Sequence, residues 1–103
     1  MSIFASETSV TLPLVFDAPH TVTIRKLTRR QFLAVADVPE TEARVRAILV
    51  AGLVAWTYAR AIDEAAFEDL DVEASEFIAD EILYLARPSL RPGVTEAAAQ
   101  KND

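Results

Sequence analysis

The stretch DVPETEARVRAILVAGLVAWTYAR, from Asp37 to Arg60, decides the fold, because it holds ten consecutive apolar residues from Ala47 to Trp56. Asp37 and Glu40 have the spacing of a capping box, in which each side chain bonds the other residue's backbone N–H. The stretch therefore predicts one long central helix that begins near Val38 and spans on the order of 35 Å.

This predicted helix changes character along its length. Its first part is amphipathic, whereas every face from Ala47 to Trp56 is apolar. A chain of 103 residues can cover one or two of those faces, so we expect the remainder to contact another subunit or another protein. The apolar stretch is too short to cross a bilayer. The candidate partner-binding residues in this stretch are Val50, Leu53, Val54, Trp56 and Tyr58.

Two features of the predicted helix have alternative interpretations. Gly52 in a helix interior costs about 1 kcal/mol relative to alanine, which indicates either a close approach of another helix or a hinge. Trp56 and Tyr58 stand at the end of the apolar stretch, where they either fill the core or anchor an interface.

The composition is that of one ordered domain. With 51% hydrophobic and 25% charged residues and only two glycines, we expect a globular unit over residues 1–93 and a flexible tail over 94–103. Cysteine is absent, which excludes disulfides and thiolate metal sites. The N-terminus does not have the pattern of a signal peptide, so a cytoplasmic location is expected.

The charges are unevenly distributed along the chain. The net charge of −6 argues against general affinity for nucleic acid. Four cations stand without an acid near residues 20–30, and nine acids stand without a base over residues 61–81. Either both groups are solvated faces, or the basic group of one copy steers onto the acidic group of another copy or of a partner. The candidate contact residues of the basic group are Arg25, Arg29 and Arg30.

The N-terminal part predicts a β-hairpin. Apolar and polar residues alternate from Ser6 to Val15 and again from Thr21 to Leu27, and the residues between them favour a turn. Pro13 has no N–H and therefore belongs on an edge strand or at a bulge.

The remainder predicts helices on either side of the central one. Thr28 and Gln31 have capping-box spacing and open a short helix, Arg29 to Ala36, whose inward residues are expected to be Phe32, Leu33, Val35 and Ala36. Ala61 to Leu70 reads as a turn or a short helical connector. Asp71 caps a further helix from Val72 to Ala86. The expected class is α+β and mainly helical, with an N-terminal β-hairpin followed by three to four helices around a long central helix.

No arrangement typical of catalysis is present in the sequence. His20 is the only histidine and stands in a turn, and the paired carboxylates read as an exposed acidic face. Gly52 and Gly93 do not form a phosphate-binding loop. We therefore expect no catalytic, cofactor-binding or metal-binding residue, and no enzymatic activity.

The segment TVTIRKLTRRQFLAV, Thr21 to Val35, resembles the tail assembly chaperones of long-tailed, siphovirus-type bacteriophages. An acidic break, a helix ending in Trp-Thr-Tyr and a last helix closing on Pro88-Ser89 follow it here, as in those small acidic proteins. The resemblance implies a non-enzymatic protein of the host cytoplasm that forms homo-oligomers, binds the tape-measure protein and brings tail-tube subunits to it. From the residues themselves we expect no cofactor, and neither nucleic acid nor a membrane as partner. The alternative is a permanent virion structural or head–tail connector protein that uses the apolar helix as an oligomer interface.

Overall fold

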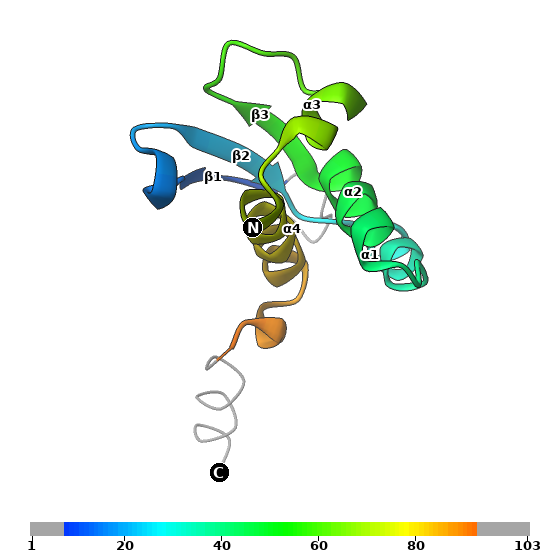
Figure 1. The fold of residues 1–103 in the computed structure, drawn as a ribbon. Coiled ribbons are helices and arrows are strands. Elements are labelled where there is room, and N and C mark those ends of the chain that lie inside the picture. The colour runs from blue at the N-terminus through cyan, green and yellow to red at the C-terminus, as the bar shows by residue number, and fades with distance from the viewer. Residues whose placement is uncertain (1–7, 93–103) are drawn as a thin grey trace.

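The computed structural model describes residues 8–92. The described chain combines one three-stranded antiparallel sheet with four α-helices (Figure 1), which confirms the α+β, mainly helical class. The expected tail, 94–103, lies outside the described residues. The elements are β1 (Ser9–Pro13), the 3-10 turn η2 (Val15–Asp17), β2 (Thr21–Arg25), α1 (Arg29–Ala36), α2 (Thr41–Gly52), β3 (Leu53–Trp56), α3 (Glu64–Asp69), α4 (Val72–Ala86) and η3 (Pro88–Leu90).

The predicted hairpin is present as β1 and β2. The two strands pair antiparallel from Ser9 opposite Arg25 to Pro13 opposite Thr21. The strand order is β1-β2-β3, so β1 with its proline is an edge strand, as the missing N–H requires. Along β2, Val22 and Ile24 are buried while their neighbours are half-buried, which is the alternation that the sequence predicted.

The prediction of one long central helix was wrong. Helix α2 ends at Gly52, and the next four residues form β3, which pairs antiparallel with β2. The hairpin is therefore one part of a three-stranded sheet. The Leu53 N–H still donates to the Leu49 carbonyl, so the chain passes from helix to strand without a loop.

A β-bulge explains why β3 looked helical. Leu53 stands opposite Ile24 and Ala55 opposite Thr23, which leaves Val54 as the extra residue of the bulge. Because of this extra residue, Leu53 and Trp56 both lie opposite buried residues of β2 although they are three positions apart. A spacing of three is also typical of one helix face. The pattern could not distinguish the two structures, although the β-branched and aromatic residues of this segment favoured a strand.

The start of α2 also differs from the prediction. The helix begins at Thr41 with Glu40 as its N-cap, and no side chain caps it. Asp37 instead ends α1, where its N–H donates to the carbonyls of Leu33 and Val35. Its carboxylate therefore does not form the predicted capping box with Glu40.

The other helices confirm the local signals. Thr28 and Gln31 form both hydrogen bonds of a capping box at the start of α1, at 2.9 and 3.1 Å. The Asp71 carboxylate accepts from the Ala74 N–H at the start of α4. The expected connector contains α3, whose N-cap is Asp63.

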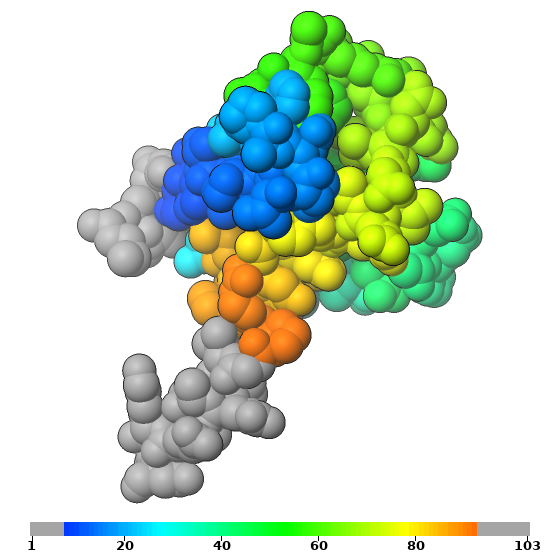
Figure 2. Space-filling view, turned by 60° about the vertical axis from the view of Figure 1, so that its left-hand side comes forward, coloured from blue at the N-terminus to red at the C-terminus, as the bar shows by residue number. Residues whose placement is uncertain are grey.

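Helix α4 is central to the core. It packs against α2 and β2 (Figure 1), and its Ile78 and Ile82 are at most 2% exposed. Figure 2 shows the end of the hairpin, in blue, against the yellow α4. The ring of Phe16, in η2, meets the ring of Phe77, in α4, edge to face at 5.5 Å. The remaining fully buried large side chains are Val22, Ile24, Ile48 and Leu49.

Gly52 lies at a close approach of α2 to α4. A Cβ atom at this position would stand 2.5 Å from Cγ2 of Ile82, which is shorter than any ordinary contact. Of the two interpretations of this glycine, the structure supports close packing. The partner is α4, and the glycine lies at the end of its helix.

Candidate partner-binding surface

The predicted apolar surface consists of two exposed valines at the junction of α2 and β3. Val50 is 59% exposed and Val54 is 51% exposed, whereas Leu53 between them is 7% exposed and belongs to the core. The bulge places Val54 outside the regular pairing of β2 and β3. Of these three residues, only the two valines are therefore placed to contact a partner.

An open hollow beside Val50 extends this surface between α1 and α2. It has a volume of about 450 Å³, and its lining includes the charged residues Arg46 and Glu64. Small side chains allow another helix to approach the backbone closely. The small apolar residues that line the hollow are Ala34, Ala43, Ala47, Val50 and Ala51.

The three candidate arginines have different environments. Arg25 is half-buried, and its Nε donates to the Ala51 carbonyl at 3.0 Å. This carbonyl belongs to the last turn of α2, where a cation is favoured by the helix dipole. Arg25 therefore stabilises the fold, whereas Arg29 and Arg30 are exposed on the first turn of α1 and form no ion pair with another described residue.

Trp56 and Tyr58 lie at the other end of β3 and not on a helix. Trp56 is half-buried against the core, and its Nε1–H donates to the Arg60 carbonyl at 2.6 Å. Its ring meets the Tyr58 ring edge to face at 5.9 Å. The structure therefore does not bring these aromatic rings into the hollow beside Val50, whose lining residues all come from α1, the segment that follows it, α2 and α3.

Tyr58 belongs to a polar cluster that the sequence did not predict. Its hydroxyl donates to an Asp17 carboxylate oxygen at 2.5 Å, and its ring stacks on His20 at 4.0 Å. His20 Nδ1 lies 2.8 Å from Thr57 Oγ1. Thr57 Oγ1 accepts a hydrogen bond from the Thr21 N–H. Burial of the hydroxyl and the neighbouring carboxylate together raise the pKa of Tyr58 to about 12. The cluster fastens the hairpin turn to the segment after β3, and His20 is one of its structural members.

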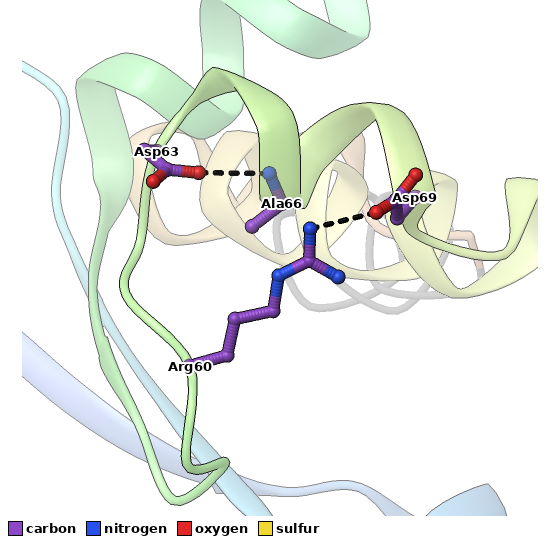
Figure 3. Close-up of polar contacts among 4 residues, drawn as sticks. All are labelled: Arg60, Asp63, Ala66 and Asp69. Carbon is purple, nitrogen blue, oxygen red and sulfur yellow. Dashed lines mark hydrogen bonds and ion pairs between the residues drawn. The ribbon is translucent and has the colours of Figure 1, made fainter.

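Several acids of the 61–81 segment are used within the chain. Figure 3 shows that Asp63 accepts from the Ala66 N–H at 2.8 Å and that Asp69 pairs with Arg60 at 2.7 Å. Glu68 pairs with Arg46 of α2. The acidic segment is therefore partly neutralised internally.

The structure corrects the prediction for α1. Leu33 was expected to face inward, but it is 50% exposed, and Ala36 is exposed too. Val35 is buried and Phe32 is half-buried, so the short helix has a narrower inner face than the sequence indicated. The sequence did contain a signal for the exposure of Leu33, because its spacing from Arg29 places both residues on one helix face.

Within residues 8–92, no three His, Asp or Glu side chains come together in a group that could hold a metal ion. None of the described helices is long and apolar enough to cross a membrane.

Comparisons of the chain with family models, with curated proteins and with solved structures found no match. The candidate surface therefore has to be interpreted from its own residues.

Proposed function

We propose that this protein is a non-enzymatic tail assembly chaperone of a long-tailed bacteriophage, which binds the tape-measure protein in the host cytoplasm and helps recruit tail-tube subunits. The sequence resemblance, which spans most of the stretch from Thr8 to Ser89, suggests the family. The structural observation that supports protein binding is the exposure of Val50, at 59%, beside an apolar hollow.

The shape of this surface is suited to a helical partner. An amphipathic helix binds by placing its apolar side chains in a groove, and the alanine-lined hollow between α1 and α2 offers such a groove. Val54 extends the apolar surface past the end of α2. A tape-measure protein is a very long helical protein, so it offers many such segments to successive chaperone copies.

The test uses the protein that the neighbouring gene encodes, if that gene specifies a very long helical chain. Fragments of that chain should copurify with the wild-type protein. Val50→Glu and Val54→Glu should each weaken this binding at least about tenfold, because a carboxylate would be buried in an apolar contact. Val15→Glu is the matched control, since Val15 is 80% exposed and lies in the hairpin turn.

Unchanged binding by both folded glutamate variants would refute the role of this surface. Failure of the wild-type protein to bind any fragment would refute the tape-measure partner.

The alternative is a permanent virion or head–tail connector protein, in which the same two valines form a fixed interface. Mass spectrometry of purified mature particles distinguishes the two. A chaperone should be found only in assembly intermediates, whereas a structural protein should remain in the finished particle at a defined copy number.

A further inference from the structure

A second hollow, at the junction of α2, α3 and α4, has an apolar floor and an acidic rim. We call it the acidic socket. Its volume is about 170 Å³. A cavity of about 150 Å³ can hold benzene, so the socket has room for the four side-chain carbon atoms of one leucine. The floor residues are Val45, Leu49, Phe67 and Leu70.

The rim of the acidic socket has an excess of negative charge. Glu42, Glu68 and Glu76 line it, together with the single cation Arg46. Arg46 pairs with Glu68. Glu42 and Glu76 form no ion pair with another described residue and are exposed. An occupant that complements this rim would carry an apolar side chain between two cations.

The same chain presents such an arrangement on α1. Arg29, Arg30 and Leu33 are all exposed, and Leu33 is 50% exposed. Residues three and four positions apart share one face of a helix, so Leu33 lies on the same face of α1 as both arginines. We call these three residues the α1 knob.

The α1 knob does not occupy the acidic socket of its own chain, because none of its three residues lines it. The inner side of α1 packs elsewhere in the same chain, since Phe32 and Val35 line a different hollow together with Arg44 and Leu83. The socket can receive this knob only from another molecule.

We propose that the acidic socket binds the α1 knob of a second copy of this chain, with Leu33 in the apolar floor and Arg29 and Arg30 against Glu42 and Glu76. Complementary charges of this kind favour a specific orientation of approach. The knob and the socket are different surfaces, so each copy offers one of each and copies associate head to tail. This contact uses a different hollow from the one beside Val50, although Arg46 lines both, and the proposal does not depend on what the Val50 surface binds.

Two variants test the contact from opposite sides. The knob variant is Leu33→Glu with Arg29→Glu and Arg30→Glu, and the socket variant is Glu42→Lys with Glu76→Lys. All five positions are exposed, so both variants should keep the wild-type circular dichroism and Trp56 fluorescence. Val15→Glu is the matched control for the introduced acid, because Val15 is exposed and lines neither surface.

The readout is the mass distribution by light scattering and sedimentation. The wild-type protein and the control should associate, with a dissociation constant that increases as salt rises from about 0.05 to 0.5 M. Each variant alone should associate at least about tenfold more weakly. Mixed in equal amounts, the two variants should form a one-to-one pair, because the knob variant retains a native socket and the socket variant retains a native knob.

Three results would overturn the proposal. These are a wild-type protein that stays monomeric at high concentration, a folded variant that associates like the wild type, and a mixture of folded variants that does not form the pair. If one variant does not fold, the single changes Leu33→Glu and Glu76→Lys replace it, with the same expected and refuting results.

Discussion

Replacing Gly52 by alanine tests the close approach of α2 to α4. The new Cβ would meet Ile82 Cγ2 at 2.5 Å and its Cδ1 at 3.0 Å, whereas ordinary contacts begin at 3.4 Å. Ile82 is fully buried and β-branched, so it cannot turn away at low cost. Overpacking of this kind costs about 1 to 3 kcal/mol.

Helix propensity acts in the opposite direction. Alanine gains about 1 kcal/mol over glycine in a helix interior, but Gly52 is the last residue of α2, so the gain is smaller. Gly52 is not in the left-handed backbone region, so alanine adds no conformational strain. We expect a net loss of about 1 to 2 kcal/mol in the free energy of unfolding, and a Tm lower by about 4 to 8 °C for each kcal/mol.

The assay is urea unfolding followed by the fluorescence of Trp56, the single tryptophan. Ile82→Ala removes all three atoms that the new Cβ would meet, at a cost of its own of about 2 to 5 kcal/mol. In that background Gly52→Ala should be neutral or slightly stabilising. A Gly52→Ala protein as stable as the wild type would refute the reasoning, and an equal loss in both backgrounds would show that Ile82 is not the obstacle.

Three further predictions concern individual polar groups. The free energy of unfolding should fall as pH rises from 10 to about 12, because folding raises the pKa of Tyr58 and the unfolded chain therefore loses the hydroxyl proton first. Urea titrations at a series of pH values measure this fall. The variant Tyr58→Phe should lack the part of the fall that is due to Tyr58. Burial raises the pKa of Asp80, and the neighbouring acids, first Glu76, raise it further. Asp80→Asn should therefore stabilise the protein at pH 7 by about 0.2 to 0.5 kcal/mol. This gain should vanish at acidic pH, where Asp80 is protonated. Arg25→Gln should lower the free energy of unfolding by about 1 to 2 kcal/mol, because the Ala51 carbonyl loses its charged donor. An unchanged urea midpoint would contradict this expectation.

The sequence predicted the structure best at positions where the signal comes from residues close together in the chain. The capping box of α1 and the Asp71 cap of α4 depend on residues three positions apart, and both formed as expected. The end of α2 depends on distant residues, because β3 exists only through its pairing with β2 and contact with the core. Local periodicity cannot contain that information.

The candidate surface was predicted only in part, because its exposure also depends on residues that are distant in sequence. Val50 and Val54 are exposed, as an intermolecular surface requires, but Leu53 is buried because β2 lies beside it. The role of Arg25 was missed because its acceptor, the Ala51 carbonyl, is 26 positions away in sequence. The acidic socket combines residues of three helices that no short sequence window contains.

The two outer strands of the sheet have a consequence for handling the protein at high concentration. An open strand edge invites uncontrolled pairing with other chains, and proteins oppose this with prolines, bulges and short strands. Here β1 carries Pro13, while β3 has four residues and a bulge at Val54. Fibril-like stacking through the sheet is thereby disfavoured at both edges, so concentrated solutions should remain free of thioflavin-positive aggregates while the native fold persists.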